Sequence, residues 1–196
     1  MKFLKEFNEL VLSMNPDDAL LFGDETSIEL NRRLSRIWWI KGERPEILVD
    51  SGRKRLNLIG VIDVTNKLGA FAEIKKLNAM QFLGFLKGLL KITHIQGKIY
   101  LVLDNARSHH AKMLNPFLKS IADRLELVFL PPYSPDFNPI EIFWRELKKN
   151  VNTNEYFETL DELRIALQEH VVQFKSPSEQ IASLWNFKKW ISEMEA

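Results

Sequence analysis

The chain has 196 residues, of which 45% are hydrophobic and 27% are charged, proportions typical of a globular domain with a buried core. It contains no cysteine, which excludes disulfides and cysteine-ligated zinc and fits a reducing compartment. The net charge is +1, and no apolar run approaches the roughly 18 residues that a membrane helix needs. We therefore expect one globular domain that does not cross a membrane.

The first part of the chain predicts a helix followed by strands. Residues 1–14 carry apolar side chains on one helical face and end before an Asn-Pro-Asp-Asp cluster. The apolar run at 19–26 ends in acid and has the form of a buried strand. Residues 36–42 predict a further short strand, and residues 54–76 divide at 66–69 into a hairpin.

The remainder of the chain alternates helix and strand. Residues 78–92 predict a largely buried helix, and the unbroken apolar run within 98–105 predicts a central strand. Ser108 is placed to cap a helix at about 109–122, which precedes a strand at 125–131. Further helices are expected at about 139–150, 159–174 and 178–194. This order predicts an α/β fold, a mixed sheet flanked by helices.

Two acidic residues stand at the ends of predicted strands. Asp24 follows the run Ala-Leu-Leu-Phe-Gly, and Asp104 follows Tyr-Leu-Val-Leu. Either residue alone could simply close a turn. On neighbouring strands, however, the two carboxylates would repel each other unless a cation lay between them. The pair therefore favours a divalent metal site.

A third acid, Glu141, opens the helix predicted at 139–150. Asn138 is a suitable N-cap, Pro139 suits the first helical position, and Glu141 stands where a capping box places its acid. An ion pair with Arg145 would also explain the glutamate. The functional alternative is a third metal-binding carboxylate on a face that binds phosphates. That face carries Glu141, Arg145, Lys148 and Lys149.

Basic residues gather before the predicted hairpin, with eight basic and three acidic residues between Asn31 and Arg55. This segment is either a solvated surface ribbon or a surface that contacts phosphates. His109 is interpreted as a helix-surface histidine or a residue that touches substrate. The candidate DNA contacts are Trp39, Lys41, Arg44, His109, Arg145, Lys148 and Lys149.

Three segments together resemble the motif blocks of a known family. FGDET, YLVLDNARSHH and LVFLPPYSPDFNPIEIFWRELKK are similar to those of the Tc/mariner superfamily, in particular its bacterial and archaeal insertion-sequence transposases. The resemblance runs from about residue 19 to 150 and implies an RNase H-like fold. It assigns the family's Asp-Asp-Glu triad to Asp24, Asp104 and Glu141. Thirty-six residues separate Asp104 from Glu141, close to the spacing usual in the superfamily.

The resemblance also implies a chemistry and its partners. The triad would bind Mg²⁺ or Mn²⁺, expected as two ions, and catalyse DNA strand cleavage followed by strand transfer. Water would attack at the transposon end to free a 3′-hydroxyl, which would then attack target DNA. We expect transposon ends and target DNA as partners, a homodimer in the active complex, and a cytoplasmic, nucleoid-associated location.

The domain prediction departs from full-length members of this superfamily. We expect a single catalytic domain over 1–196, with an N-terminal helix at 1–15, the RNase H-like core at 19–150 and C-terminal helices at 151–196. The N-terminal helix-turn-helix module that reads transposon ends is expected to be absent, so a separate chain could supply it. Two alternatives remain: a structure-specific nuclease of the same fold, resembling a resolvase, and a catalytically silent DNA-binding or assembly remnant.

Overall fold

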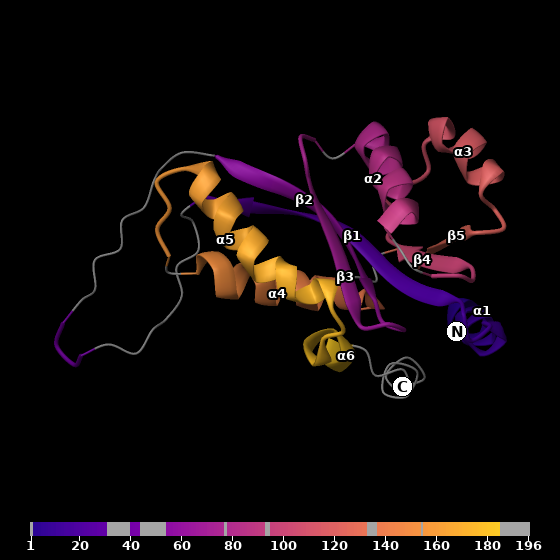
Figure 1. The fold of residues 1–196 in the computed structure, drawn as a ribbon, viewed down its shortest axis with the longest axis horizontal. Coiled ribbons are helices and arrows are strands. Elements are labelled where there is room, and N and C mark those ends of the chain that lie inside the picture. The colour runs from indigo at the N-terminus through magenta and orange to yellow at the C-terminus, as the bar shows by residue number, and fades with distance from the viewer. Residues whose placement is uncertain are drawn as a thin grey trace.

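A computed structural model describes residues 2–30, 40–43, 54–76, 78–92, 95–132, 137–153 and 155–184. At its centre is a five-stranded sheet with the strand order β3-β2-β1-β4-β5 (Figure 1). The strands are β1 (Ala19–Glu29), β2 (Arg55–Asp63), β3 (Leu68–Ile74), β4 (Ile99–Leu103) and β5 (Leu125–Phe129).

Strand direction changes at β1. The pairs β1–β2 and β2–β3 are antiparallel, whereas β1–β4 and β4–β5 are parallel. The hairpin predicted within 54–76 is confirmed as β2 and β3, and Lys67 in its turn has φ 62°. The pairing of β1 with β4 covers Ala19–Phe22, while its pairing with β2 continues to Glu29. Strand β1 therefore extends well beyond the end of β4.

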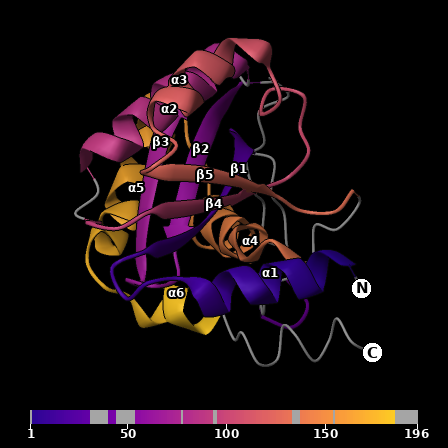
Figure 2. The same cartoon turned by 90° about the vertical axis from the view of Figure 1, so that its right-hand side faces the viewer.

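Helices cover both faces of the sheet, as the α/β prediction requires (Figures 1 and 2). One face packs against α1 (Lys2–Ser13), α4 (Pro139–Asn152), α5 (Leu160–Val172) and α6 (Glu179–Leu184). A short 3₁₀ helix, η3 (Gln173–Lys175), follows α5. The other face packs against α2 (Ala79–Ile92) and α3 (Asn115–Ser120). None of the helices in these described ranges is long and apolar enough to cross a membrane.

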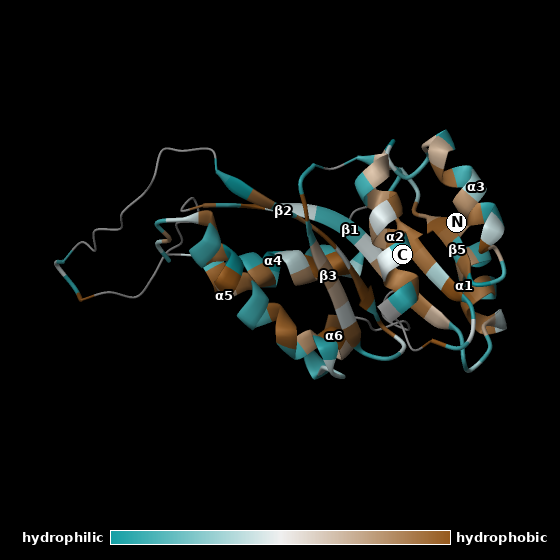
Figure 3. Ribbon diagram, turned by 45° about the horizontal axis from the view of Figure 1, so that its top comes forward, coloured by the Kyte–Doolittle hydropathy of each residue, from teal (hydrophilic) through white to brown (hydrophobic). Residues whose placement is uncertain are grey.

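The alternation of side chains along β1 supplies both cores. Leu20 and Phe22 belong to the cluster on the α4 face, and Ala19 and Leu21 belong to the cluster on the α2 face. Figure 3 shows hydrophobic stretches along the strands and alternating hydrophobic and hydrophilic residues along helices such as α5. On α4, the predicted apolar stripe is buried: Ile140, Phe143, Trp144, Leu147 and Val151.

The helix predicted at 109–122 is wrong in its bounds. Residues 107–110 form a turn, and a 3₁₀ helix, η1 (Lys112–Leu114), precedes α3. Proline is tolerated in the first turn of a helix but not in its interior, so Pro116 allows an α-helix to begin only just before it, at Asn115. Ser108 therefore does not cap this helix.

Two other predicted elements differ or fall partly outside the described ranges. Residues 40–43, part of the strand predicted at 36–42, form an exposed turn in which Gly42 has φ +97°. The remainder of that strand lies outside the described residues. Helix α6 accounts for the start of the helix predicted at 178–194, and residues 185–196 lie outside the described ranges.

Candidate active site

The register of the sheet brings Asp24 and Asp104 to the same place. Phe22 of β1 pairs with Val102 of β4, so a continuation of two residues sets Asp24 level with Asp104. Phe22 and Val102 both contribute to the core on the α4 face. Because side chains alternate along a strand, Asp24 also falls on that face, and Asp104 is the first residue after the end of β4. Asp24 is half-buried, whereas the side chain of Asp104 is 54% exposed.

Glu141 lies in the first turn of α4, exposed to solvent. The helix lies close to the sheet beside Asp24. The residue paired with Asp24 on β2 is Gly60, which has no side chain to keep the helix away. A Cβ atom at position 60 would lie 2.8 Å from Cη2 of Trp144, one turn after Glu141. The missing side chain at Gly60 therefore lets α4 approach the strand that carries Asp24.

The carboxylates influence one another electrostatically. Burial and, after it, repulsion by Glu141, Glu25 and Asp104 together raise the pKa of Asp24 to about 8, against a hydrogen bond from the backbone N–H of Glu25. Glu141 and Asp104, the other two acids predicted from the sequence, therefore lie within electrostatic reach of Asp24.

A buried histidine links β1 to the end of β4. His109 lies 3.1 Å from Glu25 through Nε2 and 3.1 Å from Asp104 Oδ1 through Nδ1, and its ring packs on Phe82 of α2. Burial alone would lower the pKa of His109, but its hydrogen bonds with Asp104 and Glu25 outweigh this and raise the pKa to about 10. The hydrogen bond from His109 in turn lowers the pKa of Asp104. The imidazolium thus bridges two carboxylates and keeps Asp104 ionised.

The donor set fits a hard divalent cation by its chemistry. Asp24, Asp104 and Glu141 offer carboxylate oxygens, the ligands that Mg²⁺ and Mn²⁺ prefer, and their mutual repulsion would fall on binding a cation. Within the described ranges, no three His, Asp or Glu side chains are gathered closely enough to hold a metal ion. Asp24, Asp104 and Glu141 therefore interact through their charges without being gathered into a closed metal cage.

Residues 19–164, three quarters of the chain, match the family described as DDE superfamily endonuclease. The chain belongs to this family. The match spans all three predicted motif blocks and confirms the resemblance drawn from them.

Relatives of this DDE chain agree with that membership. It is 26% identical over 140 residues to the insertion element IS630 uncharacterized 39 kDa protein of Shigella sonnei, a match that covers 70% of this chain and 40% of that protein. The match thus covers less than half the length of this relative.

Solved structures show the same fold. The catalytic domain of Mos1 mariner transposase has a TM-score of 0.66 at 15% identity, covering 98% of this chain and 85% of that chain. The Mos1 mariner paired end complex with Mn has a TM-score of 0.72 at 16% identity, covering 99% of this chain and 59% of that chain. These likenesses confirm the predicted RNase H-like arrangement of a mixed sheet flanked by helices.

The DDE chain does not use the predicted capping box at Glu141. Asn138 stands at the N-cap of α4, but its side chain makes no capping hydrogen bond. Its Nδ2 instead donates to the backbone carbonyl of Gly23, at 3.1 Å. The capping prediction was therefore wrong about the side chain of Asn138, which pairs with a strand distant in sequence.

The residues predicted to contact DNA differ in their exposure to solvent. Arg145 and Lys149 are exposed on α4, and Lys148 is half-buried beside them. Lys41 is exposed in its turn, whereas Trp39 and Arg44 lie outside the described residues. His109 is not on a surface: its side chain is 1% exposed, so the surface prediction was wrong, and the buried ring is not placed to contact DNA.

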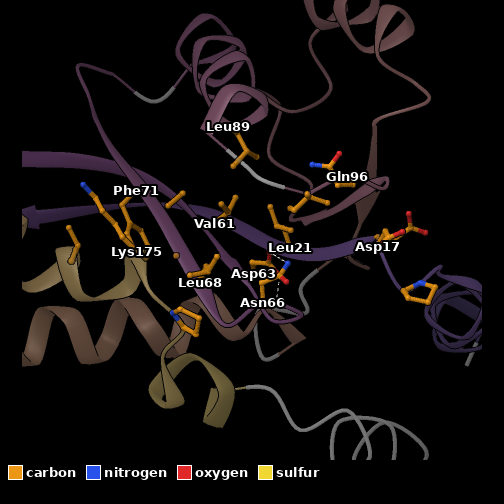
Figure 4. A pocket seen from close by; sticks show the side chains of 17 residues that line it. Asp17, Leu21, Val61, Asp63, Asn66, Leu68, Phe71, Leu89, Gln96 and Lys175 are labelled. Carbon is orange, nitrogen blue, oxygen red and sulfur yellow. Dashed lines mark hydrogen bonds between the residues drawn. The ribbon is translucent and has the colours of Figure 1, made fainter.

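A large cavity lies away from the acids of the DDE motifs. It has a volume of about 820 Å³ and lies at the opposite end of the central strands (Figure 4). Figure 4 shows Asp17, Asp63 and Lys175 among the side chains around it. A search for a site by cavity size alone would therefore miss Asp24 and Asp104.

Sequence analysis missed two features of this site. The bridge from Glu25 through His109 to Asp104 joins residues 84 positions apart, and the local pattern of the Asp104 block shows only that a histidine follows. The contact between Asn138 and Gly23 spans 115 positions. Both depend on the register of β1 against its neighbours, which sequence periodicity does not determine.

Proposed function

We propose that this chain is the catalytic domain of an insertion-sequence transposase that cleaves and joins DNA strands with divalent metal ions. The observation that carries the proposal is that Asp104 at the end of β4 and Glu141 of α4 both lie within electrostatic reach of Asp24, which follows the part of β1 that pairs with β4. These acids stand in the motif blocks of a DDE superfamily endonuclease.

Asp24, Asp104 and Glu141 would hold the metal, as two Mg²⁺ or Mn²⁺ ions. Bound ions of this kind activate the attacking hydroxyl group and stabilise the leaving oxygen of an in-line displacement at phosphorus. Asp104 takes its role already ionised, because His109 stabilises its negative charge. His109 also fixes the orientation of the Asp104 carboxylate through Oδ1, from a position supported by Glu25.

The substrate would be DNA, bound along the exposed face of α4. Arg145 and Lys149 follow Glu141 at spacings of four and eight residues, so they lie on the same side of the helix. Basic side chains there would bind phosphates next to the carboxylates, without reading base sequence. We propose transposon ends and target DNA as substrates and a homodimer as the active complex. Recognition of the ends would come from a helix-turn-helix module on a separate chain.

The direct test is a joining assay with the chain as it exists. A labelled DNA duplex with a free 3′-hydroxyl end and a supercoiled plasmid are incubated with the chain and Mg²⁺ or Mn²⁺. We expect the label to become covalently joined to the plasmid in wild type and not in Asp24→Asn. Plasmid nicking without joining would instead identify a nuclease of the same fold. DNA binding with neither reaction would identify a silent assembly subunit.

A further inference from the structure

We propose that Asn138 is a positioning residue that attaches the Glu141 end of α4 to the strand that carries Asp24. This inference rests on the proposed function, because it assigns a role at the same site. Asn138 is 3% exposed, and its Nδ2 donates to the carbonyl oxygen of Gly23. Only the amide nitrogen of an asparagine side chain can serve a carbonyl acceptor, so the orientation of the side chain follows from its partner.

The carbonyl of Gly23 lies on the edge of β1 that continues past β4. The N–H of Val64 donates to the carbonyl of Leu20, and the N–H of Leu30 donates to the carbonyl of Lys54. Both bonds lie on the β2 side of β1, so the even-numbered residues of β1 direct their backbone groups toward β2. Odd-numbered residues direct theirs toward the opposite edge. Gly23 is the first residue of β1 after its pairing with β4 ends at Phe22. Asn138 thus occupies the place of a partner strand at the point where β4 stops.

Two hydrogen bonds connect the Asp24 strand to the Glu141 backbone. The Gly23 carbonyl belongs to the peptide unit that leads into Asp24, and it accepts from Asn138. The carbonyl of Asn138 in turn accepts from the N–H of Glu141, at 3.0 Å. A shift of Asn138 along β1 would therefore move Glu141 relative to Asp24.

The far end of α4 has a matching contact. Asn152, 1% exposed, donates through Nδ2 to the carbonyl of Glu29, at 2.7 Å. Gly23 and Glu29 are six strand residues apart, a rise of about 20 Å. Asn138 and Asn152 are fourteen residues apart along the chain, a helical rise of about 21 Å. The two asparagines therefore hold the helix along the same edge at both ends, but only Asn138 lies next to the carboxylates.

This symmetry supplies a matched control. Asn138→Ser and Asn152→Ser each remove one buried hydrogen bond between α4 and β1. Serine is a good N-cap, so Asn138→Ser keeps a favourable helix start while losing the amide that reaches Gly23. Asn138→Thr, a second uncharged variant, also keeps a side chain that can cap a helix but has no amide donor. Mn²⁺ is titrated into wild type and each variant by calorimetry, and thermal melting is recorded in metal-free buffer.

We expect both serine variants to melt at lower temperature than wild type. Only the Asn138 variants should lose Mn²⁺ affinity, by about tenfold, the usual loss when the support of a metal ligand is removed. Asn152→Ser should bind within about twofold of wild type. Equal Mn²⁺ affinities in wild type and either folded Asn138 variant would overturn the inference, as would an equal loss in Asn152→Ser.

A parallel titration of Asp24→Asn separates this inference from the proposed function. Loss of Mn²⁺ binding in Asp24→Asn, together with wild-type affinity in the Asn138 variants, would overturn the positioning role and leave the metal site standing. Unchanged binding in Asp24→Asn would overturn the metal site itself, and the positioning role with it.

Discussion

The two ends of the central strands both carry aspartates, but in opposite surroundings. At the start of β1, Asp18 accepts hydrogen bonds from N–H groups of Asn15 and Lys98, at 2.8 and 2.7 Å. At the end of β2, Asp63 accepts from the backbone of Thr65 and Asn66, at 2.9 Å each. At the other end, Asp24 faces the carboxylates of Glu141, Glu25 and Asp104. Donors surround the first pair of aspartates, and other acids surround Asp24.

The cause of a pKa shift distinguishes these ends better than its direction. Burial raises the pKa of Asp63 as well as that of Asp24, but hydrogen bonds from Asn66 and Thr65 oppose the rise at Asp63. Burial would also raise the pKa of Asp18, yet its hydrogen bonds with Asn15 and Lys98 lower it overall. Only Asp24 of these three has neighbouring carboxylates among the causes. Repulsion between acids that the fold holds together therefore indicates a function rather than a structural turn.

The largest expected effect is the loss of reaction in Asp24→Asn. Removing one carboxylate from a metal site should lower the cleavage rate by about 10³-fold or more. The same change removes a carboxyl group whose ionisation is opposed by burial and by neighbouring acids, so the free energy of unfolding in metal-free buffer should stay equal or rise. Cleavage of labelled DNA and urea denaturation measure the two quantities. A large loss of stability with cleavage retained would make Asp24 a structural residue like Asp18.

The matched change at the other end is Asp18→Asn. An amide in place of this carboxylate leaves N–H donors of Asn15 or Lys98 without an acceptor, which should cost about 1–3 kcal/mol of unfolding free energy. The cleavage rate, measured at a temperature where the variant is folded, should stay within about twofold of wild type. A twofold change in rate corresponds to a change in the activation barrier well below the roughly 1.4 kcal/mol of a tenfold change. An equal loss of cleavage at both aspartates would remove the distinction between the two ends.

The pH dependence of stability should also differ between the ends. The pKa of Asp24 is about 8 in the folded chain and 3.8 in the reference state, so between these values the folded chain holds a proton that the unfolded chain releases. Stability should therefore fall as pH rises, by up to about 1.4 kcal/mol per pH unit from this group.

This slope is best measured between about pH 5 and about pH 6, below the ordinary pKa of 6.5 for the histidine that bridges Asp104 and Glu25. Asp24→Asn should flatten the slope, because the titrating group is gone. Asp18→Asn should keep it, since the lowered pKa of Asp18 confines its contribution to more acidic solution, where its stabilisation is lost as pH falls. Identical slopes in wild type and Asp24→Asn would contradict the raised pKa.

The smallest effect is expected on DNA affinity. Replacing Arg145 and Lys149 with alanine should weaken binding to all duplexes alike and reduce the slope of log affinity against log salt by about two contacts. The control replaces Lys91 and Lys119, which are exposed on the helices of the other face and change the net charge equally. Fluorescence anisotropy at several salt concentrations measures both slopes. Equal slopes for the two double variants would place the DNA elsewhere.

Much of the fold was predictable because its strands are rich in apolar residues. β4 is an unbroken apolar run that ends where Asp104 marked its end, whereas β1 continues past Asp24 to Glu29, so the prediction that Asp24 ends its strand was wrong. The apolar stripe of α4 likewise predicted which side of the helix is buried and left Glu141 on the exposed side. These features depend on local periodicity, which the sequence displays directly.

The errors arose where tertiary contacts outweigh local preference. Asn138 has a favourable capping position, yet its amide bonds to Gly23 across the fold. His109 looks like a polar residue of a surface helix, yet the chain turns it inward between Asp104 and Glu25. In both cases the partner is supplied by β1, and only the strand register shows that it is within reach.

The most direct test of the central claim is the position of Mn²⁺ in a crystal of this chain soaked with the metal. We predict anomalous density within about 2.0–2.3 Å of carboxylate oxygens of Asp24 and Asp104, with Glu141 beside it, as expected for Mn²⁺ bound by oxygen ligands. Asp24→Asn crystals should lose that density. Mn²⁺ density confined to the opposite end of the strands, near Asp18 and Asp63, or unchanged density in Asp24→Asn, would contradict the assignment of the site.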